Sequence, residues 1–277
     1  MATIVEMINP LTGLPEQVDK LDHTAQEIDD AVGLAPQLSN PNLLDNWYFG
    51  NPVNQRNVSG TIDAVGYFLD RWKLVSGSVT IGSNGITLNG TIVQILETAV
   101  GAEVTASALT TEGVVVASYD NNSKTISLTG TGQTFVAAKL ELGTQQTLAH
   151  QDENGNWVLN EIPDYGEQLR RCQRYFWRSW TGERNVQNSI LGVVFGNNHR
   201  ITGFDYPVEM RTRPSITVYG LTGAGKVTEF ASDADYGPAS PAYWDTQRCV
   251  ALACDGAGLS NDNRVYYFIE ANAELWD

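Results

Sequence analysis

Apolar and polar residues alternate along much of the chain between about residues 42 and 163. The segment "GSVTIGSNGITLNGTIVQIL" (77–96) alternates on both sides of Ser83-Asn84-Gly85, which has the composition of a tight hairpin turn. The segment "GVVVASYDNNSKTISLTGTG" (113–132) repeats this design around Asp120-Asn121-Asn122. Short alternating strands joined by regular turns predict an antiparallel β-sandwich, or jelly roll, over residues 37–165.

A second β-rich region is predicted within residues 166–277. Its strands are expected at "SILGVVFG" (189–196), "SITVYGL" (215–221), "RCVALAC" (248–254) and "RVYYFIEANAEL" (264–275). The residues between the two regions, "EQLRRCQRYFW" (167–177), are good helix formers and predict a connector helix. The expected fold class is therefore mainly β, with two antiparallel, jelly-roll-like β-sandwiches.

The N-terminal residues 1–36 follow a different period. Apolar residues separated alternately by four and three positions form a heptad stripe, which consists of Leu14, Val18, Leu21, Ala25, Ile28 and Val32. A helix this short needs a packing partner, which is either the protein's own domains or the same helix in partner chains. We favour the second alternative, because the linker "APQLSNPN" (35–42) separates the stripe from the rest. We therefore expect a coiled-coil helix that attaches and trimerises the chain.

The charge balance limits the partners. The chain has 17 basic and 32 acidic residues and a formal net charge of −15. An average surface of this kind repels a phosphate backbone, so we expect no nucleic-acid partner. No apolar run reaches the length of a transmembrane helix, so we expect no membrane insertion. Three cysteines, an odd number, predict reduced thiols rather than a disulfide framework.

One segment departs from this acidic character. The stretch "EQLRRCQRYFWRSW" (167–180) interleaves four arginines with aromatic residues, a composition that is typical of single-strand nucleic-acid platforms. At helical spacing, however, Leu169, Cys172, Tyr175 and Phe176 share one face, while Arg170, Arg174 and Arg178 follow another. We expect the apolar face to pack on a sandwich. We expect the arginines to pair with Glu161, Asp164 and Glu167, or with a neighbouring subunit.

Motifs for catalysis or cofactors give weak signals. The segment "GLTGAGKV" (220–227) approaches a phosphate-binding loop, but valine stands where a hydroxyl residue is required and no helix pattern follows, so we expect a glycine-rich loop. The segment "DENGNW" (152–157) predicts a tight turn rather than a calcium loop. The three histidines are isolated and no catalytic motif is present. We expect no metal, no cofactor and no enzymatic activity.

Aromatic residues in turn-rich stretches are candidates for carbohydrate binding. A flat aromatic ring can cover the C–H face of a sugar while neighbouring polar side chains bond its hydroxyls. The alternative for each aromatic residue is ordinary core packing. The candidates are Tyr243, Trp244 and Asp245 in "PASPAYWDTQR", together with Tyr236 and Trp180.

An ordered series of segments resembles tail-fibre and receptor-binding proteins of bacteriophages and prophages. The series is "NLLDNWYFGNPVNQR" (42–56), "YFLDRWKL" (67–74), "KLELGTQQTLAH" (139–150) and "YGEQLRRCQRYFWR" (165–178), and it covers about residues 40 to 180. The resemblance implies a jelly-roll, carbohydrate-module-like sandwich, a connector and a C-terminal β domain. It also implies a homotrimer on a virion, held by other virion proteins through the N-terminus and bound to a bacterial surface polysaccharide. A structural head or collar fibre and a glycan-degrading tail fibre are the alternatives.

Overall fold

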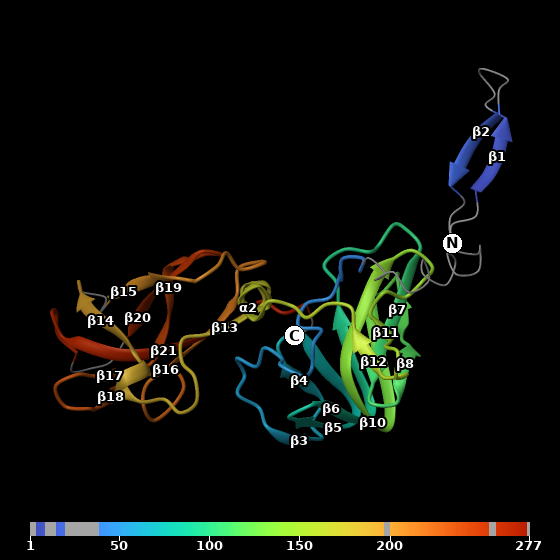
Figure 1. The fold of residues 1–277 in the computed structure, drawn as a ribbon. Coiled ribbons are helices and arrows are strands. Elements are labelled where there is room, and N and C mark those ends of the chain that lie inside the picture. The colour runs from blue at the N-terminus through green and yellow to red at the C-terminus, as the bar shows by residue number, and fades with distance from the viewer. Residues whose placement is uncertain (1–3, 9–14, 20–38, 197–199, 255–258, 276–277) are drawn as a thin grey trace. The chain divides into compact units, whose positions relative to one another are not determined.

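The computed structural model describes residues 4–8, 15–19, 39–196, 200–254 and 259–275 (Figure 1). The chain divides into two compact units, residues 1–39 and residues 40–277. The described residues are mainly β, and their paired strands are antiparallel, as the alternation predicted. The helix of this part of the chain is α2 (Tyr165–Gln173), together with the short 3₁₀ helix η1 (Val186–Asn188).

The first unit contains a two-stranded antiparallel ribbon. Strand β1 (Ile4–Ile8) pairs with β2 (Pro15–Asp19), and Val5 lies opposite Val18. The predicted helix is therefore wrong for Pro15–Asp19, because β1 supplies backbone partners that a stripe of apolar residues does not reveal. Pro15 suits the first position of a strand, where its missing N–H costs least. The other heptad positions, Leu14, Leu21, Ala25, Ile28 and Val32, lie outside the described residues.

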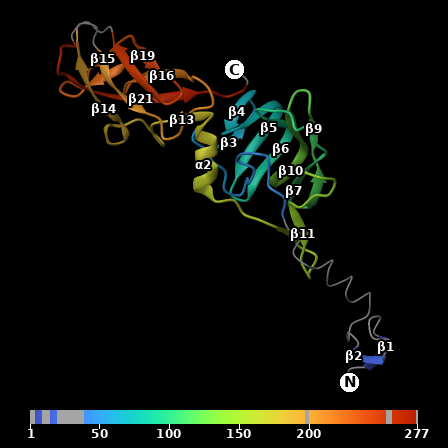
Figure 2. The same ribbon diagram turned by 90° about the horizontal axis from the view of Figure 1, so that it is seen from above.

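The first sheet of the second unit has the strand order β3-β5-β6-β10-β7-β8, and Figure 2 shows its central strands side by side. Its strands are β3 (Gly60–Ile62), β4 (Gly66–Leu69), β5 (Trp72–Gly82), β6 (Gly85–Ile95), β7 (Val104–Thr110), β8 (Gly113–Val116), β9 (Ser118–Asp120) and β10 (Thr125–Leu142). Both predicted hairpins are confirmed. Gly82 pairs with Gly85 across the first turn, and Asp120 pairs with Thr125 across the second.

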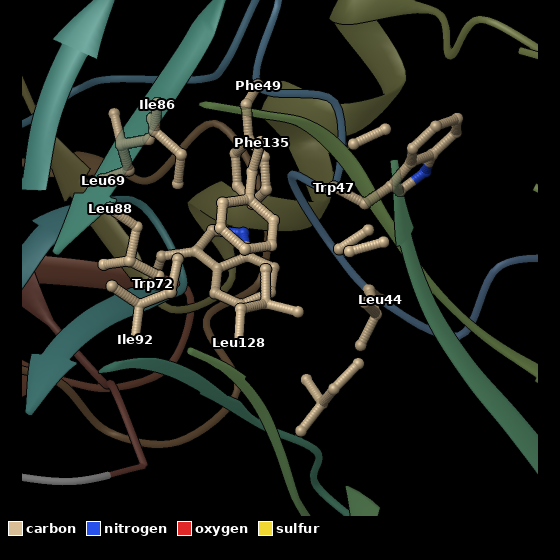
Figure 3. Packing of buried hydrophobic residues seen from close by; sticks show 14 of the residues in the cluster. Leu44, Trp47, Phe49, Leu69, Trp72, Ile86, Leu88, Ile92, Leu128 and Phe135 are labelled. Carbon is tan, nitrogen blue, oxygen red and sulfur yellow. The ribbon is translucent and has the colours of Figure 1, made fainter. Parts of the chain in front are cut away.

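The core of this sheet is aromatic at its centre. Trp72 is fully buried, its ring meets Phe49 edge-on at a centroid distance of 5.2 Å, and Phe135 packs in the same cluster (Figure 3). The indole Nε1 of Trp72 donates a 2.8 Å hydrogen bond to the Asn46 carbonyl oxygen. A buried tryptophan removes a large apolar area from water, and this bond satisfies its polar atom. The cluster therefore joins the loop before β3 to the sheet.

The second sheet has the strand order β18-β17-β21-β14-β15-β20-β19, with β13 and β16 also paired to β21. Its strands are β13 (Phe176–Arg178), β14 (Ile190–Phe195), β15 (Arg200–Asp205), β16 (Ser215–Tyr219), β17 (Val227–Glu229), β18 (Asp235–Tyr236), β19 (Ala239–Asp245), β20 (Cys249–Cys254) and β21 (Arg264–Asn272). The strand predicted at residues 264–275 forms as β21, and its Val265, Tyr267, Ile269 and Ala271 enter a separate buried cluster. Cys172, Cys249 and Cys254 all lie in the described residues, and they form no disulfide there.

Candidate functional site

The predicted carbohydrate candidates are dispersed over the second sheet. Tyr243, Trp244 and Asp245 lie in β19, whose backbone pairs with β20; the side chains of these three lie outside the described part of the structure. Tyr236 lies in β18, is half-buried and packs against the buried cluster of this sheet.

Trp180 is a core residue, which corrects its selection as a sugar platform. Only 5% of it is exposed. Its ring meets Tyr219 and Phe268 edge-on, at centroid distances of 5.4 and 5.8 Å, and the Arg178 guanidinium lies 4.2 Å from the ring centroid. These neighbours come from β13, β16 and β21, so the ring offers no open face for a sugar. The sequence could not show this, because the three strands meet only in the folded sheet.

A different tryptophan lies at the surface of the first half of the chain. Trp157 begins β12 (Trp157–Leu159), which pairs with β11 (Ala149–Gln151) in a hairpin. The predicted turn is confirmed: Asp152 Oδ1 accepts hydrogen bonds from the backbone N–H groups of Asn154 and Asn156, at 2.9 and 2.8 Å. These bonds, chiefly that from Asn156, lower the pKa of Asp152. The hairpin thus fixes Trp157 next to the turn.

Trp157 lines a groove of about 700 Å³ between this hairpin and the β7–β8 turn. Trp157 is 37% exposed. A methyl group added at Gly113 would lie 2.8 Å from the indole Nε1 of Trp157. Polar and apolar residues line the groove together with Trp157, namely Thr110, Thr111, Glu112, Gln151, Asn156, Leu109, Val136, Val158, Leu159, Ile162 and Gly155. An aromatic ring that is partly exposed beside hydroxyl, amide and carboxylate groups can bind a sugar ring. We call this the Trp157 groove.

The connector helix α2 forms where it was predicted, but the arginines of this basic stretch contact residues other than the expected ones. Arg171 Nε lies 2.7 Å from Asp45 Oδ1, and Arg174 Nη2 lies 3.2 Å from Glu97 Oε1. Arg178 Nη1 donates to the Arg56 carbonyl oxygen at 2.7 Å.

The expected partners of these arginines have other functions. Asp164 is the N-cap of α2 and accepts from the Glu167 N–H at 2.7 Å, which stabilises the helix start. Glu161 Oε1 lies 3.6 Å from Lys139 Nζ. The helix ends at Gln173, so Tyr175 and Phe176 follow it rather than lie on its apolar face, and Phe176 begins β13. The pairing expected within the chain is therefore wrong for Arg174 and Arg178, which contact Glu97 and the Arg56 carbonyl oxygen instead.

A buried network of charges joins the first sheet to the end of the chain. Arg71 Nη1 donates to Glu274 Oε2 at 2.9 Å, and Arg56 Nη2 donates to Glu274 Oε1 at 3.0 Å. Burial raises the pKa of Asp70 to about 7, although the nearby Arg56 opposes this shift. Two guanidinium groups thus hold the buried Glu274 carboxylate, while Arg56 Nε and Asp70 Oδ1 lie 3.8 Å apart and make no hydrogen bond in the described structure.

The remaining motif is a loop. The segment "GLTGAGKV" follows β16, closes on itself through a 2.9 Å bond from the Gly220 N–H to the Gly223 carbonyl oxygen, and leads into strand β17. In the ranges that the structure describes, no three His, Cys, Asp or Glu side chains gather as ligands for a metal ion. The helices of those ranges include none with the length and apolar character needed to cross a membrane.

The fold and these sites define a mainly β protein with antiparallel sheets and a tryptophan-lined surface groove. Comparison with known proteins adds no relative: no family model, no curated protein and no solved structure matches this chain.

Proposed function

We propose that this chain is a bacteriophage fibre or receptor-binding protein that adsorbs to a bacterial surface glycan. The Trp157 groove is the observation that supports the proposal best. It combines a half-exposed indole with the hydroxyl, amide and carboxylate groups of Thr111, Gln151, Asn156 and Glu112. Sugars are bound by such combinations of ring stacking and directed hydrogen bonds.

The proposal extends to architecture and assembly. The two sheets are the two jelly-roll-like sandwiches of the fibre, and residues 1–36 attach it to other virion proteins and trimerise it. Three copies of a weak sugar site on one assembly bind a polyvalent glycan far better than one copy does. The chain is then part of the virion, and adsorption makes or breaks no covalent bond.

The decisive experiment measures binding of the purified protein to host cells and to their isolated surface polysaccharide. Trp157→Ala removes the stacking surface and is expected to abolish or strongly weaken binding. Trp157→Phe keeps a flat ring and is expected to retain part of it. Tyr165→Ala is the matched control, because Tyr165 is also exposed (44%) but lies outside the groove. Unchanged binding by Trp157→Ala contradicts the groove as the receptor site.

The same preparation tests the alternatives. Release of new reducing ends from the polysaccharide indicates a glycan-degrading fibre. Wild-type protein that neither binds cells nor blocks phage adsorption indicates a head or collar fibre whose β domains are spacers. Because Trp244 is also a candidate, Trp244→Ala is measured in parallel; loss of binding there, but not in Trp157→Ala, moves the receptor site to β19.

A further inference from the structure

A second cavity, of about 490 Å³, lies between α2 and the loop that follows β6. It shares no residue with the Trp157 groove. Its charged groups are Asp45, Arg71, Glu97, Arg171 and Arg174, and Leu43, Leu96 and Val100 contribute an apolar wall. The cavity therefore combines three guanidinium groups with an apolar surface in a chain whose net charge is −15.

The carboxylates of this cavity are already engaged. Both oxygens of Asp45 are bonded, one to Arg71 Nε at 3.2 Å and the other to Arg171 Nε at 2.7 Å, and its side chain is 12% exposed. Glu97 Oε1 accepts from the Tyr175 hydroxyl at 2.6 Å and lies 3.2 Å from Arg174 Nη2. Both oxygens of Asp45 and one oxygen of Glu97 are thus paired with groups of the protein.

The guanidinium groups of Arg171 and Arg174 are the more open charges. Their side chains are 37% and 47% exposed, and the two residues lie one helical turn apart at the C-terminal end of α2. Arg171 contacts Asp45 through Nε, and Arg174 contacts Glu97 through Nη2, so each guanidinium has further N–H groups that these pairs do not use. A guanidinium fork matches the planar oxygens of a carboxylate or the oxygens of a phosphate.

We propose that this cavity binds the acidic substituent of a saccharide, a carboxylate or a phosphate, between Arg171 and Arg174. The apolar wall formed by Leu43, Leu96 and Val100 would cover the C–H surface of the same sugar. This assigns a function to the basic stretch that stands out in an acidic chain. The site is independent of the Trp157 groove, so either site can fail its test without affecting the other.

The test is a titration of the full chain with three monosaccharides, in which binding is measured by calorimetry and by NMR of the ligand. D-Galacturonate carries a carboxylate, D-glucose 1-phosphate carries a phosphate, and D-galactose carries neither. The acidic sugars are expected to bind and D-galactose is not, and binding is expected to weaken as salt is raised. Preference for galacturonate assigns a carboxylate ligand, and preference for the phosphate ester assigns a phosphate ligand. No saturable binding of either, or equal binding of D-galactose, overturns the proposal.

Variants locate the site. Arg174→Gln is expected to weaken binding of the acidic sugar about tenfold, because it removes a charge-assisted hydrogen bond. Arg171→Gln is expected to act in the same direction. Arg170→Gln is the matched control: it removes the same charge from an exposed neighbour on α2 that does not line the cavity. Thermal unfolding is measured for each variant. If Arg174→Gln leaves the affinity unchanged, or if Arg170→Gln weakens it equally, the cavity is not the site.

Discussion

Arg71 and Glu274 are 203 residues apart in the chain, yet Arg71 Nη1 donates a 2.9 Å hydrogen bond to Glu274 Oε2 in the interior. The side chains are 2% and 0% exposed. The guanidinium of Arg71 also lies 3.5 Å from the centroid of the Tyr175 ring, and the neighbouring carboxylates of Glu274 and Asp45 raise its pKa against the effect of burial. This pair connects the turn between β4 and β5 to the residues that follow β21.

Removing Glu274 is expected to destabilise the fold strongly. Glu274→Leu leaves the buried guanidinium of Arg71 without its main counter-charge and also removes a partner of Arg56. Breaking a buried ion pair in this way costs about 3–5 kcal/mol of unfolding free energy. Chemical denaturation measures the loss. The control is Glu209→Ala, which breaks the exposed pair with Arg248 and is expected to cost less than about 1 kcal/mol. Equal losses of unfolding free energy in the two variants would contradict a stabilising role of the buried Arg71–Glu274 pair.

Asp70 is expected to make stability fall as the pH rises towards neutrality. Its pKa is about 7 in the folded protein, against an ordinary value of 3.8, because burial disfavours the charged form. The folded state therefore holds a proton that the unfolded state releases, so this contribution is complete below pH 3.8 and is lost as the pH passes 7.

The variant Asp70→Asn tests this direction. It is permanently neutral, so its stability relative to the wild type is expected to increase from pH 5 to pH 8, as measured by urea unfolding at each pH. The amide oxygen can still accept the 2.7 Å bond from the Gln55 N–H. A stability difference between the two proteins that does not vary with pH contradicts a titrating Asp70.

The close pairing of β5 with β6 requires glycine at position 77, which lies opposite Gly90. Gly77 has φ of +76°, and a methyl group added there would lie 2.1 Å from the Asn89 carbonyl oxygen. Gly77→Ala therefore combines backbone strain with a clash against the neighbouring strand, and is expected to cost at least about 3 kcal/mol or to prevent folding. Gly223→Ala is the control, since nothing lies within 4 Å of its added methyl group. Thermal unfolding compares the two, and similar midpoints would contradict the close approach.

The trimer is expected to be visible in solution. Multi-angle light scattering is predicted to give about 91 kDa, the mass of three chains of 30.3 kDa. The double variant Leu21→Asp and Ile28→Asp places two charges on the heptad stripe and is expected to reduce the mass to that of one chain. Gln26→Asp changes a position off the stripe and is expected to leave the trimer intact. A wild-type mass near 30 kDa removes the trimer from the proposed function.

Local sequence patterns predicted elements whose stabilising contacts are themselves local. The hairpins around Ser83-Asn84 and around Asp152-Asn154 formed as predicted, because turn residues and alternation act within a few positions. The connector helix formed because Asp164 caps it. The helix predicted from the heptad stripe is wrong at Pro15–Asp19, because this segment pairs as a strand with Ile4–Ile8. Strand pairing depends on a partner segment that a periodic pattern does not contain.

Local sequence patterns were enough to predict the mainly β class, the principal turns and the position of the connector helix. The contacts of the arginines and tryptophans, in contrast, depend on how distant segments pack together. Asp45 and Glu97 became the partners of Arg171 and Arg174 because the first sheet brings them to α2. Trp180 was buried by strands from three parts of the chain, while Trp157 remained half-exposed over Gly113. Charge pairing and burial depend on distances between segments far apart in sequence, and only the folded sheets set those distances.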